Sequence, residues 1–156
     1  VARSKLISKT YVATGDQNNN KSLIDLINKK TKIPIYCGND DNVLERYYKI
    51  ALLEKPDIIV RITADCPFID AEIIDKVIKL LIKEKSDYAS NILKRTFPDG
   101  LDVEAFTFKA LCKTFKMVKD KFSQEHVTTF MHGVSKHTKK NGNFKKSNLE
   151  NDFDFE

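Results

Sequence analysis

The chain has 156 residues, of which 41% are hydrophobic and 31% charged, a balance that suits one globular domain with its own core. Its formal net charge is +5, but lysines alternate with acidic residues along most of the sequence, which argues against nucleic-acid binding. No apolar stretch is long enough to cross a bilayer and no basic and apolar leader opens the chain, so we expect no membrane partner and a cytoplasmic protein.

Strand and helix patterns alternate from residue 11 to residue 93. In chain order they are a strand at 11–14, a helix at 22–30, a strand at 33–38, a helix at 39–55, a strand at 57–63, a helix at 70–85 and a strand at 87–93. Ser22 and Asp70 are the expected N-caps of their helices. The strand at 57–63 is apolar on both sides of its alternation, so we expect it at the centre of the sheet. Such alternation is typical of an α/β fold with a mostly parallel sheet.

The alternation breaks after residue 93. A loop at 95–100 is followed by a strand pattern at 101–108, which we expect to join the sheet as an antiparallel member, and by helix patterns at 108–122 and 123–136. From about His137 onward the chain carries a basic block and then an acidic one, with few apolar residues. We expect little independent structure in this polar C-terminal segment, residues 137–156.

The cysteines and histidines form no recognisable disulfide or metal pattern. The three cysteines are an odd number without a CxxC pair, which favours reduced thiols over a disulfide framework or a structural zinc site. The three histidines lack the HExxH spacing of a zinc protease. A metal cluster built from these residues is not expected.

Asp65 directly follows the apolar strand at 57–63, and Pro67 prevents that strand from continuing. Ligands of open α/β sheets bind outside the carboxyl ends of the strands, so Asp65 is expected at a ligand-binding edge. A Mg²⁺ ion needs one or two such carboxylates and takes its other ligands from water and phosphate. The alternative is that Asp65 only caps the next helix, although Asp70 has the better spacing for that role.

The segment "CGNDDNVLERYY" is a second candidate site. Gly38 permits close approach of a ligand to the backbone, and the following helix N-terminus could hold a nucleotide or a sugar. Asp40 and Asp41 weaken a phosphate interpretation but could accept hydrogen bonds from a base or ribose, with Arg46 nearby on the helix. Helix capping and ordinary surface charge are the alternative.

The segment "RTFPDGLDVE" is a third candidate site, because it gathers Arg95, Asp99, Asp102 and Glu104 around a Pro-Asp-Gly turn. A hairpin entry would explain the turn without any function. It would not explain why Asp102 and Glu104, two residues apart on a strand, point the same way.

The segment "SQEHVT" is the fourth candidate, where Glu125 and His126 could act as an acid/base or substrate-orienting pair. Adjacent residues of a helix face about 100° apart, which disfavours a directly cooperating pair. A helix cap at Ser123 with two surface residues is the alternative.

Taken in order, these segments resemble one known family. From Tyr11 to Asn151, "YVAT", "GNDDNVLERYY", "DIIVRITADCPFID", "DYASN", "RTFPDGLDVEAF" and "SQEHVT" are similar to the cytidylyltransferases that include spore-coat polysaccharide biosynthesis proteins. That family is related to the acylneuraminate and 3-deoxy-manno-octulosonate cytidylyltransferases. The resemblance implies a three-layer α/β domain of the nucleotide-diphospho-sugar transferase (Rossmann-like) type, with a mostly parallel sheet and one antiparallel strand.

The resemblance also implies a reaction and its residues. A sugar or sugar-acid oxygen would attack the α-phosphate of CTP, releasing pyrophosphate, with Asp65 as the catalytic Mg²⁺ carboxylate. Gly38, Asp41 and Arg46 would border the nucleotide. Asn91, Asp99, Asp102 and Glu104 would face the sugar, and Glu125 and His126 would be substrate-side or structural. Related enzymes form homodimers, for which residues 105–130 are the region to examine.

Two departures from the family pattern limit this expectation. The chain begins after the basic, glycine-containing phosphate loop of the family and ends before the strand that supplies a second metal carboxylate. We therefore interpret residues 1–156 as a single partial nucleotidyltransferase domain, expected to bind CTP poorly and to show no turnover by itself. The alternatives are a non-catalytic sugar-nucleotide-binding or assembly domain, or a glycosyltransferase, although no DxD motif follows a predicted strand.

Overall fold

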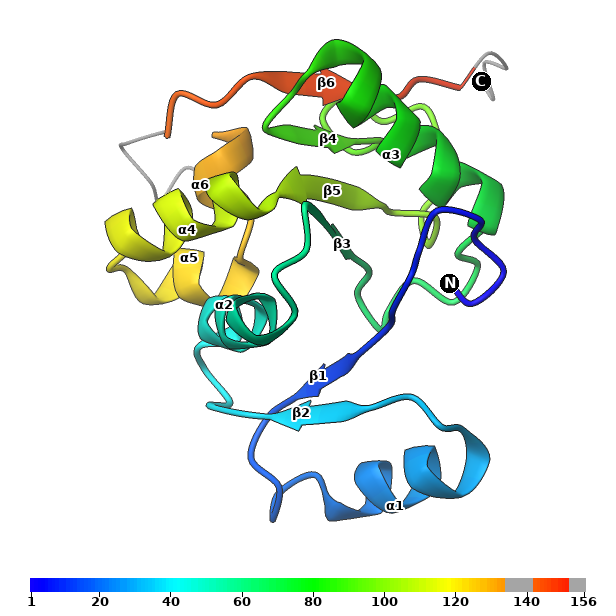
Figure 1. Cartoon of the computed structure of the whole chain (residues 1–156), viewed down its shortest axis with the longest axis vertical. Helices are drawn as coiled ribbons and strands as arrows, with labels where there is room; N and C mark the ends of the chain where they lie inside the picture. The colour runs from blue at the N-terminus through cyan, green and yellow to red at the C-terminus, as the bar shows by residue number, and fades with distance from the viewer. Residues whose placement is uncertain (134–141, 152–156) are drawn as a thin grey trace.

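The structure is a computed structural model that describes residues 1–133 and 142–151. Its elements in chain order are β1 (Val12–Thr14), α1 (Lys21–Lys30), β2 (Ile35–Cys37), α2 (Val43–Glu54), β3 (Ile58–Arg61), α3 (Ala71–Glu84), β4 (Tyr88–Ser90), β5 (Glu104–Thr107), α4 (Phe108–Met117), α5 (Lys121–His126), α6 (Thr129–His132) and β6 (Lys146–Asn148) (Figure 1). The predicted alternation of strands and helices up to β4 is confirmed.

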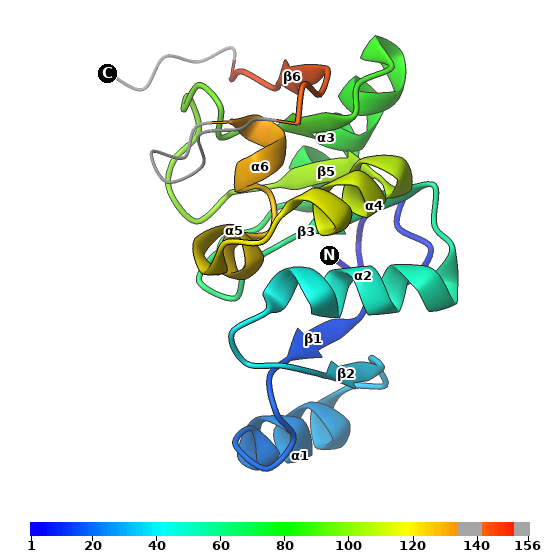
Figure 2. The same cartoon turned by 90° about the vertical axis from the view of Figure 1, so that its left-hand side faces the viewer.

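The strands form two sheets. β1 and β2 are parallel neighbours, and the other four strands lie in the order β3-β5-β4-β6. β5 is antiparallel to both β3 and β4, whereas β6 is parallel to β4. The prediction of a mostly parallel sheet with one antiparallel member at 101–108 is therefore confirmed. Figures 1 and 2 show α1 at one end of the molecule, beside β1 and β2 and away from the four-stranded sheet.

Helices cover both faces of the four-stranded sheet, which gives the three layers expected. On one face, Tyr88 and Phe106 pack with Leu44 of α2 and Leu111 of α4. On the other face, neighbouring residues of the same strands, such as Ala89 and Ala105, pack with the apolar side of α3. Successive strand residues point to opposite faces, so two separate cores form around one sheet.

The predicted central position of β3 is wrong for the part of the chain that the structure describes. There β3 pairs only with β5 and lies at the edge of its sheet. Its apolar composition has a different cause: Ile59 packs into the core on the α2 and α4 side, whereas Ile58 and Val60 pack on the α3 side. Apolar residues on both faces of a strand indicate that helices cover the strand from above and below. They do not indicate how many strands lie beside it.

The predicted single helix at 123–136 is also wrong. The chain forms α5 and α6 instead, separated at Val127, whose φ of 58° and ψ of −58° lie outside helical values. The backbone N–H of Thr128 donates to the carbonyl oxygen of His126 at 2.5 Å, so Val127 is the centre of a γ-turn. Its side chain is fully buried. Core packing of Val127 outweighs the backbone strain of this turn.

Two smaller expectations are corrected. Asn20, and not Ser22, is the N-cap of α1, and its side chain makes no capping hydrogen bond. In the polar C-terminal segment, residues 146–148 form β6 against β4, whereas His137 lies outside the described residues. Among the residues that the structure describes, no helix combines the length and apolarity needed to span a membrane.

Candidate functional site

Asp65 lies in the turn between β3 and α3, with its side chain exposed. The turn is closed by a hydrogen bond from the backbone N–H of Cys66 to the carbonyl oxygen of Thr63, at 3.2 Å. Hydrogen bonds from the Thr63 hydroxyl, from the backbone and from the Cys66 thiol lower the pKa of Asp65. The carboxylate is therefore ionised and faces solvent at the carboxyl end of β3.

The helix-capping alternative is satisfied by Asp70, as its spacing predicted. Its Oδ1 accepts hydrogen bonds from the backbone N–H groups of Glu72, at 2.7 Å, and Ile73, at 3.2 Å. Asp65 is thus left without a capping role and remains available to a ligand. In the described ranges, no three His, Cys, Asp or Glu side chains gather into a metal site.

The loop at 95–102 packs against the Asp65 turn. Gly100 has a φ of 91°, and a Cβ atom there would lie 3.0 Å from the Phe68 ring, so glycine suits both the turn and the close contact. Arg95 donates through both Nη atoms to Asp102, at 3.2 and 3.0 Å, and through Nη1 to Asp99 at 2.9 Å. This loop is consequently held as one unit, with an exposed guanidinium between two carboxylates.

Asn91 supports the same loop from inside the fold. Its Nδ2 donates to the carbonyl oxygen of Leu101 at 2.8 Å, and its Oδ1 accepts from the backbone N–H of Val103 at 2.9 Å. The side chain is almost fully buried. Of the predicted sugar-side residues, Asp99 and Asp102 therefore lie on one loop beside the Asp65 turn, and Asn91 fixes the shape of that loop.

Glu104 lies deeper than the other sugar-side candidates. Its Oε2 accepts a charged hydrogen bond from Arg61 Nη1 at 2.5 Å, and its Oε1 accepts from the Tyr88 hydroxyl at 2.7 Å. The three residues come from β3, β5 and β4, and Arg61 stands directly opposite Glu104 in the sheet register. Burial and the nearby Glu104 charge raise the pKa of Tyr88 well above its usual value.

Sequence reasoning missed Arg61. The signal was present, because a charged residue interrupts the apolar run "IIVRI" of the strand pattern. A cation inside a buried strand requires a partner, and the structure provides Glu104. The partner could not be identified from the sequence, since 43 residues separate the two.

The loops after β1 and β2 interlock through Gly15, Gly38, Asp40 and Arg46, a group that we call the clasp. The carboxylate of Asp40 accepts from the backbone N–H of Asp16, at 2.9 Å, and from Asn19 Nδ2, at 3.0 Å. These hydrogen bonds, with that from Asn19 first, lower the pKa of Asp40. The second loop is thereby attached to the first.

Arg46 completes the clasp from α2. Its Nη1 donates to the carbonyl oxygen of Ala13 at 3.1 Å, its Nη2 donates to that of Asp40 at 3.3 Å, and the side chain is buried. Arg46 thus holds the strand end and the loop together rather than presenting its charge to solvent. Asp41, also predicted at the nucleotide, has an exposed side chain that makes no hydrogen bond within the described chain.

The clasp makes a testable prediction about its two glycines. A Cβ on Gly38 would lie 2.8 Å from Arg46 Cγ. The Arg46 side chain cannot easily move away, because its guanidinium is hydrogen-bonded to two carbonyl oxygens. Gly38→Ala is therefore expected to destabilise the fold by about 1–3 kcal/mol. At Gly15 the Cβ would first meet Asp40 Oδ1, 1.7 Å away. This exposed carboxylate can move aside and exchange its hydrogen bonds with Asp16 and Asn19 for water, so Gly15→Ala is expected to cost less. Urea denaturation compares the two variants. Equal losses of stability would contradict the proposed fixing of Arg46.

Glu125 and His126 are both exposed on α5. The His126 ring contacts the Phe122 ring with 4.3 Å between centroids. Neither side chain makes a hydrogen bond or ion pair with the Asp65 turn within the described ranges.

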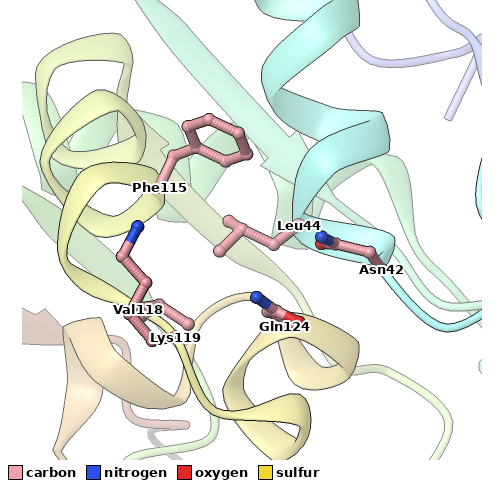
Figure 3. Close-up of a pocket in the computed structure, with 6 residues that line it drawn as sticks. All are labelled: Asn42, Leu44, Phe115, Val118, Lys119 and Gln124. Atoms are coloured by element: carbon pink, nitrogen blue, oxygen red, sulfur yellow. The ribbon is translucent and has the colours of Figure 1, made fainter.

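A pocket beside α5, shown in Figure 3, lies between the start of α2 and the α4–α5 connection. It is lined by Asn42, Leu44, Phe115, Val118, Lys119 and Gln124.

Comparison with known proteins links this arrangement to a family. The chain is 36% identical over 132 residues to an uncharacterized protein of Methanocaldococcus jannaschii, covering 83% of this chain and 52% of that protein. It is 30% identical over 122 residues to the spore coat polysaccharide biosynthesis protein SpsF of Bacillus subtilis, covering 77% and 49%. The chain spans about half the length of these curated relatives.

Two solved structures share the fold. A cytidylyltransferase from Leptospira borgpetersenii superposes with a TM-score of 0.85 at 27% identity, covering 98% of this chain and 62% of that one. The CMP:2-keto-3-deoxy-manno-octonic acid synthetase complexed with CTP has a TM-score of 0.60 at 9% identity, covering 96% and 76%. The family model described as cytidylyltransferase matches residues 1–145. The chain therefore belongs to the cytidylyltransferase family.

Proposed function

We propose that the protein carrying these residues transfers a cytidylyl group from CTP to a sugar or sugar acid for cell-surface polysaccharide biosynthesis, and releases pyrophosphate. The observation that carries the proposal is the cytidylyltransferase match over residues 1–145. The name of the Bacillus subtilis relative supports the polysaccharide role, and the octonic acid synthetase was solved with CTP. We further propose that the protein works in the cytoplasm and pairs as a homodimer through residues 105–130.

The proposed reaction requires alignment and charge neutralisation more than covalent help from the protein, because a sugar oxygen displaces pyrophosphate at the α-phosphate. We propose that Asp65 holds a Mg²⁺ ion, since its exposed, ionised carboxylate offers a hard oxygen ligand and leaves the other positions to phosphate and water. Bound Mg²⁺ would neutralise phosphate charge.

The chain's own residues have separate roles in this proposal. The clasp keeps the loops after β1 and β2 in one position, and Asp41 remains exposed to meet the nucleotide. Asp99 and Asp102, fixed by Arg95, present oxygens beside Asp65 to the hydroxyl groups of the sugar. Glu125 and His126 are proposed to lie on the substrate side.

Calorimetry tests the nucleotide, and pyrophosphate release tests the reaction. The full-length protein is titrated with CTP, UTP and ATP, with and without Mg²⁺, and CTP is expected to bind best and only with the metal. Pyrophosphate release is then measured with sugar acids and with neutral sugars as acceptors. A preference for UTP, or no nucleotide binding, would contradict the proposal.

A further inference from the structure

Arg61 and Glu104 form an ion pair at the end of β3 in which the two side chains differ in their exposure to solvent. Arg61 and Glu104 are in contact, but 16% of the Arg61 side chain is exposed against 4% of the Glu104 side chain. Both carboxylate oxygens of Glu104 are used, one by Arg61 and one by the Tyr88 hydroxyl. Because Glu104 is also buried, it presents no oxygen to a ligand, and Arg61 is the member of the pair that reaches solvent.

The guanidinium of Arg61 has donors left over. Of its five N–H groups, the described chain uses only one on Nη1, which binds Glu104. Nε and Nη2 make no hydrogen bond within the described ranges, and neither is among the buried polar atoms that lack a partner. Arg46 is different, because its Nε is buried and unsatisfied. Arg61 thus offers accessible donors, whereas Arg46 does not.

The position of Arg61 links these donors to the candidate site. Arg61 is the last residue of β3, and its chain continues directly into the Asp65 turn. Its positive charge contributes to lowering the pKa of Asp65, and Ile59, two residues earlier on the same face of β3, packs into the core on the α2 and α4 side. The Arg61 side chain accordingly lies on the α2 side of β3, at the end of the strand where ligands of such sheets bind.

We propose that Arg61 binds an anionic group of a substrate, a phosphate or a carboxylate, and that Glu104 and Tyr88 hold its guanidinium in place. The proposal deepens the proposed function and rests on it for the identity of the ligand. Arginine suits this role because its planar fork can give two hydrogen bonds to one anion. In cytidylyl transfer the anion comes from the triphosphate of CTP or from the carboxylate of a sugar acid.

The test separates ligand binding from a purely structural pairing with Glu104. Arg61→Met alone leaves the Glu104 carboxylate buried without its cation and is expected to unfold easily. The double variant R61M/E104Q leaves no charge at this pair, and the amide oxygen that replaces the Glu104 carboxylate can accept from Tyr88, so this variant is expected to regain stability. If Arg61 binds the anion, the double variant should bind that anion about 10- to 100-fold more weakly than the original protein, even though it is folded.

Probes distinguish the two sources of the anion in the full-length protein. If Arg61 meets the triphosphate, R61M/E104Q weakens binding of Mg·CTP and of inorganic pyrophosphate but leaves cytidine unchanged. If Arg61 meets a sugar carboxylate, CTP binding is unchanged, and KM rises for a sugar acid but not for the corresponding neutral sugar.

Three further outcomes would decide the matter. Equal binding of every probe by R61M/E104Q and the original protein would overturn the role of Arg61, as would an original protein that binds none of the anionic probes. Arg61-dependent binding of pyrophosphate by a protein that does not bind CTP would support this inference while contradicting the proposed function.

Discussion

Replacing Asp65 with asparagine is expected to lower the rate of cytidylyl transfer by about 100- to 1,000-fold while leaving the fold intact. Asparagine keeps the shape of the side chain but removes a negative charge at the carboxyl end of β3. Because Asp65 is exposed and caps no helix, the variant weakens only the surface hydrogen bonds that lower the pKa of Asp65, and little stability should be lost. The rate is measured as pyrophosphate release by the full-length protein with CTP and an acceptor, and the fold by thermal unfolding.

Asp70 provides the matched control. It lies five residues further along the same loop and caps α3, and asparagine is an equally good N-cap, so Asp70→Asn should change neither the rate nor the unfolding temperature. The Mg²⁺ concentration for half-maximal rate should rise in the Asp65 variant alone. An Asp65→Asn protein with full activity, or one with an unchanged Mg²⁺ requirement, would contradict the proposed metal role.

The sequence predicts the alternating part of the fold well, because periodic burial is a local property. The helix at 70–85 has apolar residues on one side and Asp70 at its start, and the structure places α3 and its cap there. Predictions from the sequence fail where contacts between residues far apart in the chain determine the local conformation. The γ-turn at Val127 is one, because a strained backbone is stable there only while the core holds the side chain.

In the candidate site too, features set by neighbouring residues were predicted and features set by distant residues were not. The position of Asp65 at the carboxyl end of β3 and the capping role of Asp70 follow from spacing along one loop, and both were predicted. The partners of Arg46 and Arg61 were not, since Arg46 reaches Ala13 and Arg61 reaches Glu104 across 33 and 43 residues. No local pattern tells whether an arginine will bind a ligand, a carbonyl or a buried carboxylate. The assignments of individual residues to nucleotide or sugar therefore remain predictions.

Removing the carboxylate of Glu104 is expected to cause a large loss of stability. In Glu104→Ala the Arg61 guanidinium and the Tyr88 hydroxyl lose their shared partner inside the sheet, a change that costs about 3–5 kcal/mol for a buried pair. In a chain of this size such a loss lowers the unfolding temperature by about 10 °C. Urea denaturation and thermal unfolding both measure it.

Asp102→Ala is the comparison variant, in which the broken arginine–carboxylate pair is exposed. Asp102 also pairs with an arginine, but Arg95 is about half exposed, and exposed pairs contribute about 0–1 kcal/mol. Each variant breaks one arginine–carboxylate pair of the same strand region, but Glu104→Ala also removes the partner of the Tyr88 hydroxyl, whereas Arg95 keeps its contact with Asp99. We expect a large loss of stability for Glu104→Ala and a small one for Asp102→Ala. Water can replace the lost partner of the exposed Arg95, but it cannot fully solvate the Arg61 guanidinium. Equal losses would mean that the Arg61–Glu104 pair is hydrated in solution, and the inference that Glu104 orients Arg61 from inside the fold would then lose its basis.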